Sequence, residues 1–264
     1  MNPELVQHLI AINREFYTAF ASAFAESRSL AQPSLQRVLA CVPPAGRVLD
    51  VGCGHGRMAH LLDRDRPGAS YLGLDFSSRL IALAREGTAS LTRVEVAFDV
   101  ADLSQTGWSG RLDSRCFDSI LLLAVLHHIP AHQNRLGLLR ALGDYLVHDG
   151  RLVVSAWQFT TNPRMRRKIV PWDRVGIDPA GLEAGDYLLD WKRGGVGYRY
   201  CHLIDEEELA QLAAGSGLQL LESWRADGKE GDLSLFGVLA RHLSRSSFGL
   251  EYNQAQNCHS KPKQ

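Results

Sequence analysis

The sequence has no excess of charge of either sign and no hydrophobic run of membrane-spanning length. Lys and Arg together number 29, as do Asp and Glu, so the formal net charge of the 264 residues is zero. This balance does not indicate a protein that binds nucleic acid through its overall charge, although it allows a local basic patch. A transmembrane helix needs about 20 consecutive apolar residues, and no such run occurs. The composition therefore indicates a globular protein that does not associate with membranes.

Cysteine is scarce and dispersed. The five cysteines include no C-x-x-C pair, which is the spacing expected of zinc ligands, so the sequence predicts no metal site. The N-terminal segment carries Glu4 and Glu15 and lacks the apolar core of a secretory signal. These absences predict a protein of the reducing cytoplasm, with the nucleus as the other compartment they allow.

Glycine, in contrast, is concentrated in one short stretch. The segment RVLDVGCGHGRMAHLL, residues 47–62, places Gly52, Gly54 and Gly56 directly after an apolar run and before a helical pattern. Glycine allows positive φ angles and a close approach of the backbone to a ligand. A strand, a glycine-rich turn and a helix N-terminus form a ligand site at the carboxyl edge of a parallel sheet.

The rest of the chain supports such a sheet, because apolar runs alternate with helical patterns. Helices are predicted at 3–28, 33–42, 57–63, 78–86, 132–147 and 205–214, and strands at 47–51, 70–76, 93–100, 117–125, 150–157, 217–226 and 233–242. Ser77 is the expected cap of the helix at 78–86. The last two strands are expected to form an antiparallel pair. The prediction is an α/β fold with helices on both faces of a mostly parallel sheet.

Three segments depart from this alternation. Residues 1–44 are predicted to form N-terminal helices that precede a domain at 45–241. Residues 158–200, rich in Gly, Arg and aromatic residues, are predicted to be an insertion after the fifth strand. The polar segment 242–264 is predicted to be a mobile tail.

The glycine turn favours S-adenosylmethionine over a nicotinamide cofactor. Its spacing, G-x-G-x-G, is one residue shorter than the dinucleotide fingerprint. Asp50 precedes the first glycine by two residues, and a carboxylate there would repel a pyrophosphate. The same carboxylate could receive the ammonium group of an amino-acid ligand, directly or through water.

Acidic residues follow the next two strands as well. Asp75 ends the second strand, where a carboxylate can accept both ribose hydroxyls of a nucleoside. Asp99 follows the third strand and could accept the adenine amino group, while the amide of Val100 faces the ring. Asp102 is a close rival of Asp99 for that role. The alternative is that these acids only cap helices.

These motifs together resemble those of class I S-adenosylmethionine-dependent methyltransferases. The resemblance covers about residues 45–155, through VLDVGCGHGR, YLGLDFS and FDSILLLAVLHHI. It implies a Rossmann-like seven-stranded sheet whose last strand is antiparallel. It also implies a set of S-adenosyl-L-methionine contacts: Asp50, Gly52, Cys53, Gly54, Asp75, Phe76, Asp99, Val100 and Ala124.

A second resemblance, over about residues 10–240, concerns the substrate. The segments NREFYTAFASAFAESR, AVLHHI and RYCHLIDEEEL are similar to those of the methyltransferases that esterify 5-carboxymethyluridine at the tRNA wobble position, including the methyltransferase part of AlkB homologue 8. This resemblance implies a tRNA anticodon loop as partner and allows a small activator subunit. The chain departs from that family at EGDLSLFGV, where Asp232 and Leu233 replace an Asn-aromatic pair.

The chemistry implied by the second resemblance is attack of a carboxylate on a sulfonium methyl group. The acceptor is already ionised at neutral pH, so no general base is required. A cation must hold the carboxylate, and Arg199 is the first candidate, with Arg193 as the second. His127, His128 and His202 are candidate hydrogen-bond donors. Each histidine could instead be a structural residue, as a turn cap or in the core.

The insertion supplies candidate contacts to RNA, and it is expected to cap the substrate site. Trp157 at its border and Trp172 within it could stack on a base that has left the helix. Arg164 and Arg167, in the run RMRRK, could bind phosphates. The simpler alternatives are a small aromatic core and a solvated charged face. Two other functions remain open: methylation of a carboxylate or hydroxyl on a small molecule, and a non-catalytic partner subunit with the same fold.

Overall fold

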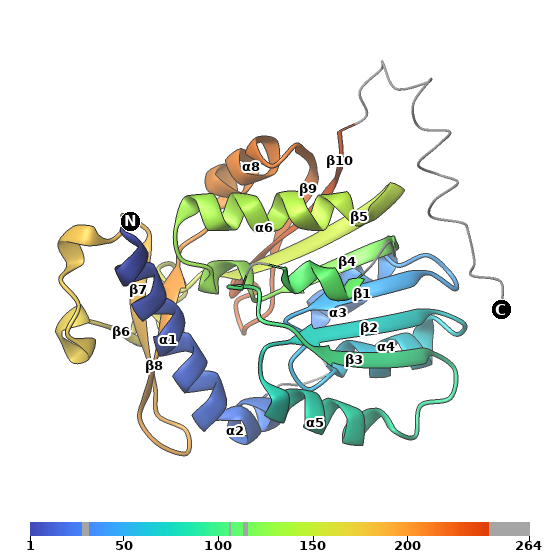
Figure 1. The fold of residues 1–264 in the computed structure, drawn as a ribbon, viewed down its shortest axis with the longest axis horizontal. Coiled ribbons are helices and arrows are strands. Elements are labelled where there is room, and N and C mark those ends of the chain that lie inside the picture. The colour runs from blue at the N-terminus through green and yellow to red at the C-terminus, as the bar shows by residue number, and fades with distance from the viewer. Residues whose placement is uncertain (28–31, 106, 113–115, 243–264) are drawn as a thin grey trace.

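A seven-stranded sheet forms the centre of the protein, as the computed structural model shows (Figure 1). The structure describes residues 1–27, 32–105, 107–112 and 116–242. The strand order is β3-β2-β1-β4-β5-β10-β9. The strands are β1 (Arg47–Val51), β2 (Ser70–Asp75), β3 (Glu95–Val100), β4 (Phe117–Leu123), β5 (Leu146–Trp157), β9 (Leu218–Ala226) and β10 (Ser234–Arg241).

The pairing of the strands confirms the predicted sheet. Strands β1 to β5 pair with one another in parallel, and β10 runs antiparallel to both β5 and β9. The carboxyl ends of β1, β2, β3 and β4 therefore meet at one edge. The glycine turn, Asp75 and the segment after β3 all lie along this edge.

Helices cover both faces of the sheet and bury its apolar side chains. One face packs against α6 (His132–Asp144) and α8 (Glu206–Gly215). The other packs against α3 (Pro33–Ala40), α4 (Arg57–Asp65) and α5 (Ser78–Thr88). Burial on both faces explains the continuous apolar runs of these strands.

The predicted helix at 3–28 is divided in two. Helix α1 (Pro3–Ala19) ends where the backbone leaves the helical region at Phe20, and α2 (Ala21–Glu26) follows. Helix α1 crosses in front of the insertion rather than packing on the large sheet (Figure 1). Its Leu9 and Ile12 share an apolar cluster with Leu188 and Tyr200 of the insertion.

The insertion forms a second, antiparallel sheet of three strands, β6 (Ile169–Val170), β7 (Asp186–Trp191) and β8 (Gly197–His202). It also contains the short helix α7 (Pro163–Arg166) and two 3₁₀ turns, η3 (Trp172–Val175) and η4 (Pro179–Gly181). Together with α1 it faces the edge of the large sheet at which the parallel strands end (Figure 1).

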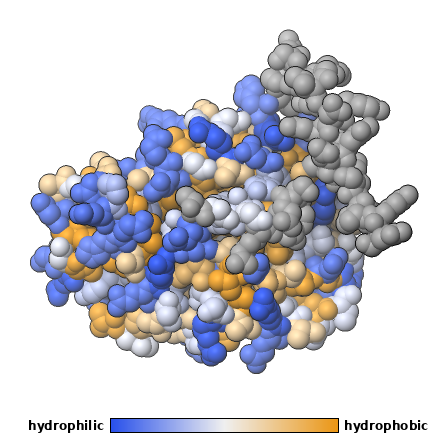
Figure 2. All heavy atoms as spheres, viewed as in Figure 1, coloured by the Kyte–Doolittle hydropathy of each residue, from blue (hydrophilic) through white to orange (hydrophobic). Residues whose placement is uncertain are grey.

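On the face shown in Figure 2, hydrophilic side chains cover much of the insertion, with smaller apolar areas between them. No helix among the described residues is long and apolar enough to cross a membrane. The tail predicted at 242–264 lies, except for His242, outside the described residues.

Candidate cofactor and acceptor site

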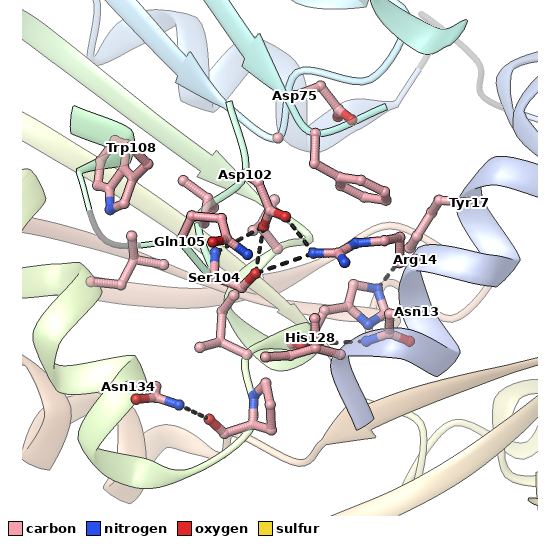
Figure 3. Close-up of a pocket in the computed structure, with 18 of the residues that line it drawn as sticks. Asn13, Arg14, Tyr17, Asp75, Asp102, Ser104, Gln105, Trp108, His128 and Asn134 are labelled. Atoms are coloured by element: carbon pink, nitrogen blue, oxygen red, sulfur yellow. Dashed lines mark hydrogen bonds and ion pairs between the residues drawn. The ribbon is translucent and has the colours of Figure 1, made fainter. Parts of the chain in front are cut away.

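A cavity of about 880 Å³ lies at the carboxyl edge of the large sheet, between this edge and α1 (Figure 3). The sheet side of its wall includes five residues predicted as cofactor contacts: Gly52, Cys53, Gly54, Asp75 and Phe76. Ala124, which follows β4, also lines it. The opposite wall comes from α1. The sequence-predicted turn therefore opens into this cavity.

Two glycines shape the floor of this cavity in different ways. Gly52 has a φ of +75°, and a Cβ atom there would lie 2.2 Å from Cγ2 of Val125. Gly54 has a φ of +59°, but a Cβ atom on it would approach only the ring of Phe24, at 4.0 Å. Gly52 is thus required by packing, whereas Gly54 leaves open space that a ligand can fill.

Asp75 connects this turn to the next helix. Its carboxylate accepts hydrogen bonds from the backbone amides of Gly54 and Ser77, each at 2.9 Å. Ser77 caps α5 through its side chain, as predicted. Burial raises the pKa of Asp75 to about 6, although the two amide hydrogen bonds lower it. A buried carboxylate of this kind gains from further donors, which the hydroxyls of a ribose provide.

Asp50 lies behind the turn and is not part of the cavity wall. The hydroxyl of Tyr71 donates a hydrogen bond to its carboxylate at 2.8 Å. Burial raises the pKa of Asp50 to about 6, against the opposing effects of Tyr71 and Arg57. The predicted contact with an ammonium group would therefore need water or a shift of the turn.

The segment after β3 presents Asp102 rather than Asp99 to the cavity. Ala101 and Asp102 line it, whereas the Asp99 carboxylate accepts from the amide of its neighbour Val100 at 2.8 Å. The Asp102 carboxylate accepts from Ser104 and from Arg14 of α1 (Figure 3). The adenine contacts at Asp99 and Val100 remain predictions. Asp102, which the sequence offered as the alternative to Asp99, lines the cavity.

Helix α1 supplies wall residues that sequence reasoning did not identify. Asn13, Arg14 and Tyr17 line the cavity and lie close together on one side of the helix (Figure 3). The Asn13 amide donates to the backbone carbonyls of His128 and Tyr200, at 3.3 and 3.1 Å. The only signal in the sequence was that polar residues interrupt the apolar pattern of this helix, and such a pattern by itself does not specify a site.

The two adjacent histidines have different positions. His128 lines the cavity and lies 2.8 Å from the Tyr17 hydroxyl through Nε2. His127 is fully buried and packs on the ring of Trp157, with ring centroids 4.6 Å apart. Both remain candidates for the reaction, but only His128 contacts the open space.

Arg199 is buried next to this wall in a cage of aromatic rings. Its guanidinium carbon lies 4.8 Å from the ring centre of Phe16, 4.9 Å from Trp157 and 5.2 Å from Trp191. Arg199 lies on β8, and only 2% of the residue is exposed. Its Nε has no hydrogen-bond partner among the described residues.

His202 belongs to a charge network at the outer side of the site. Its Nδ1 lies 2.7 Å from Asp186, and its Nε2 lies 3.0 Å from Glu208. Arg135 of α6 donates to Glu183 and Glu208. Burial alone would lower the pKa of His202, but the hydrogen bonds that its ring donates to Asp186 and Glu208 raise it. Ligand atoms of Glu183, Asp186 and His202 lie within 4.8 Å of one another, yet Arg135 and Tyr200 already bind these carboxylates.

The remaining predicted substrate residues lie in the insertion, away from the cavity wall. Trp172 is half-buried in the cluster that joins the insertion to α1. Arg164, Arg167 and Arg193 are exposed. The carbonyl of Arg193 accepts from the indole of Trp191 at 2.5 Å. The cavity and the exposed arginines of the insertion therefore lie in different parts of the structure.

Parts of this chain are similar in sequence to known proteins. A family described as a methyltransferase domain matches residues 24–223. A tRNA (carboxymethyluridine(34)-5-O)-methyltransferase of Schizosaccharomyces pombe is 23% identical over 223 residues, covering 79% of this chain and 89% of that protein. A probable tRNA methyltransferase 9B of Bos taurus is 24% identical over 174 residues, covering 65% of this chain and 35% of that protein.

The solved structures agree on the fold. A SAM-dependent methyltransferase from Methanosarcina mazei has a TM-score of 0.60 and 19% identity, covering 79% of this chain and 98% of that one. The chain spans only about a third of the Bos taurus relative. The family match extends over most of the chain and includes the glycine turn and the cavity floor. The chain therefore belongs to the methyltransferase-domain family.

Proposed function

We propose that this protein transfers the methyl group of S-adenosylmethionine to the carboxylate of a carboxymethyl group on the wobble uridine of tRNA, forming a methyl ester. The relatives named as tRNA methyltransferases support the substrate class. Two features of the structure also support it: a buried arginine that could bind a carboxylate, and an exposed basic surface that could bind RNA.

The observation that carries the proposal is the burial of the Arg199 guanidinium among aromatic rings. A guanidinium surrounded by three aromatic rings has lost its hydration, and no ion pair joins it to a carboxylate within the described residues. A buried charge without such a partner is costly. An acceptor carboxylate would supply the missing charge through a bidentate hydrogen bond. Trp157, which packs on both Arg199 and His128, connects this cage to the cavity wall.

The insertion carries the surface proposed to hold the tRNA. Arg164, Arg166 and Arg167 are exposed around α7, and Lys192 and Arg193 are exposed at the turn after β7. The zero net charge of the chain does not oppose this role, because phosphate binding depends on local cations. We infer that these side chains bind phosphates of the anticodon arm while the modified base enters the site.

The chemistry needs positioning more than proton transfer. S-adenosylmethionine would supply an electrophilic methyl group, and Gly54 and Asp75 would hold this cofactor at the sheet edge. Arg199 holds the carboxylate, which is ionised at neutral pH. The aromatic rings around Arg199 exclude water, so the carboxylate oxygen is partly desolvated when it attacks. No base is required for this step.

The test uses an anticodon stem-loop with 5-carboxymethyluridine at the wobble position and cofactor with a labelled methyl group. The expected product is a methyl ester, whose label is lost on mild saponification, and an unmodified uridine stem-loop should take up none. Arg199→Met should lower turnover by about 100-fold or more, since a hydrogen bond to a charged group contributes about 1.5–3 kcal/mol and two are expected. Arg140→Met, on the exposed side of α6, is the matched control.

The competing function is methylation of a small carboxylate or hydroxyl compound. Binding of the stem-loop should weaken steeply as salt rises if phosphates are bound. No binding at low salt and no transfer, with cofactor affinity intact, would refute the tRNA substrate but leave the enzyme class unchanged.

A further inference from the structure

Asn13 of α1 has a defined orientation in the cavity wall. Its Nδ2 lies 3.3 Å from the carbonyl oxygen of His128 and 3.1 Å from that of Tyr200. A carbonyl oxygen only accepts hydrogen bonds, so the NH₂ group of the amide faces these two atoms and uses both of its hydrogens on them. Asn13 therefore has no donor left for a ligand.

The Oδ1 atom of Asn13, in contrast, has no hydrogen-bond partner among the described residues, although only 7% of the residue is exposed. A buried acceptor without a donor costs free energy, and most such atoms in native proteins are paired. Asn13 lines the cavity, so a bound molecule can bring the missing donor. Neighbouring side chains cover the Oδ1 atom, and side-chain movements of the kind that are common on binding would open it.

Two contacts place Asn13 beside the arginine that is proposed to hold the acceptor carboxylate. Tyr200, whose carbonyl binds the Asn13 amide, directly follows Arg199 on β8. Phe16, whose ring packs on the Arg199 guanidinium, lies three positions after Asn13 on α1. Residues at this spacing are neighbours on one side of a helix. The unpaired acceptor and the buried cation therefore belong to the same part of the wall.

We propose that Asn13 selects uracil as the base by accepting a hydrogen bond from its N3–H group. Enzymes that act on a base outside the stack read it through hydrogen bonds to its Watson–Crick edge. In uracil the C4 carbonyl lies between N3 and C5, so one wall can contact N3–H while it binds the group on C5. The inference rests on the proposed function and adds to it a residue that determines specificity.

The same contact would reject cytosine. Neutral cytosine has no hydrogen at N3, so its ring nitrogen would bring a second acceptor against Oδ1 of Asn13. A site built to hydrogen-bond one group of its substrate discriminates against an analogue without that group, because the buried atom of the site is left unpaired.

The experiment compares three anticodon stem-loops that differ only at the wobble base: 5-carboxymethyluridine, its N3-methylated form and 5-carboxymethylcytidine. All three offer the same carboxylate to Arg199. In the wild type, kcat/KM for the uridine stem-loop should exceed that for each of the other two by about 10- to 100-fold, the size expected when a hydrogen bond is lost and a buried acceptor stays unpaired. In Asn13→Ala, both ratios should fall close to one.

Two further variants separate this role from a structural one. Asn13→Ser keeps a donor for one of the two carbonyls but withdraws the acceptor, so it should lose the preference as well. Asn2→Ala removes the side-chain cap of α1. It weakens the same helix and keeps the acceptor, so the two ratios should stay at their wild-type values.

The outcomes distinguish this inference from the proposed function. Equal rates on the three stem-loops in the wild type, or a preference that persists in Asn13→Ala and Asn13→Ser, would overturn the inference and leave the proposed function standing. Loss of the preference in Asn2→Ala would assign the effect to α1 as a whole and would also overturn the inference. Transfer to none of the stem-loops while calorimetry shows the cofactor bound would refute the proposed function, and this inference with it.

Discussion

The backbone amide of Gly54 donates a hydrogen bond to the carboxylate of Asp75 at 2.9 Å. This bond joins the turn after β1 to the end of β2, so the two predicted cofactor contacts form one structural unit. A ligand that binds either of them affects both.

Replacement of Asp75 should therefore weaken cofactor binding. In Asp75→Asn, one of the two backbone amides would face an NH₂ group instead of an oxygen, and the charge is lost. Hydrogen bonds to charged groups contribute about 1.5–3 kcal/mol, so the dissociation constant should rise roughly 10- to 150-fold in calorimetry. Asp149→Asn, at a surface position, should leave it unchanged. Equal affinity in both variants would exclude Asp75 from the binding site.

The raised pKa values of Asp50 and Asp75, both about 6, predict a pH dependence of stability. Burial disfavours the charged form, so the cofactor-free protein should lose stability as the pH rises from about 4 to 6, between the unfolded and the folded pKa values. Donors on the cofactor favour the charged form, so its affinity should rise over the same range. Binding at pH 6 should release protons, and calorimetry in buffers of different ionisation enthalpy measures them. Proton uptake would contradict this.

The two glycines should respond differently to alanine. In Gly52→Ala the new Cβ would collide with Val125, in addition to the strain of a positive φ, so the main effect should be on folding. In Gly54→Ala the left-handed strain costs roughly 1–2 kcal/mol, while the new methyl group projects into the cavity. Cofactor affinity should thus fall more than stability. Thermal unfolding and calorimetry separate the two effects, and normal binding by Gly54→Ala would show that the ligand lies elsewhere.

Arg135 should be important for stability because it joins α6, α8 and the insertion. Only 1% of its side chain is exposed, and it pairs with both Glu183 and Glu208. Removing one partner of a buried ion pair typically costs about 3–5 kcal/mol, so Arg135→Met should lower the free energy of unfolding by about 3 kcal/mol. Denaturant titration measures this. A change below about 1 kcal/mol, the size typical of surface pairs, would show that the network does not hold the insertion.

His202 should make the stability of this network depend on pH. Its pKa is raised in the folded state, so its contribution is complete below about 6.5, the ordinary histidine value, and is lost as the pH rises through the folded pKa. The midpoint temperature of thermal unfolding should therefore fall more steeply above pH 6.5 in the wild type than in His202→Gln. If the stability of both proteins changed with pH in the same way, His202 would not be protonated in the folded state.

Local patterns predicted much of the fold. Alternating apolar runs and helical patterns located the strands, and Ser77 was recognised as a cap because capping depends on neighbours in sequence. The glycine turn was predictable for the same reason. The break at Phe20 was not, because its apolar pattern continues across the break.

The site was predicted less completely, since its geometry depends on contacts between distant segments. Arg14 meets Asp102 across 88 positions of sequence, and no local pattern indicates such a pair. The choice between Asp99 and Asp102 depends on which side of the chain faces the cavity after β3 ends. Likewise, no local pattern indicates that Arg135, Asp186 and Glu208 lie around His202, because they come from other elements.

The central claim is that the cavity beneath α1 holds S-adenosylmethionine, and a crystal structure with S-adenosylhomocysteine tests it most directly. We predict that the ligand lies in this cavity, with its ribose hydroxyls on Asp75 and its amino-acid end over the turn at Gly52–Gly54. A ligand bound outside the cavity, or a bound ribose that does not touch Asp75, would contradict it.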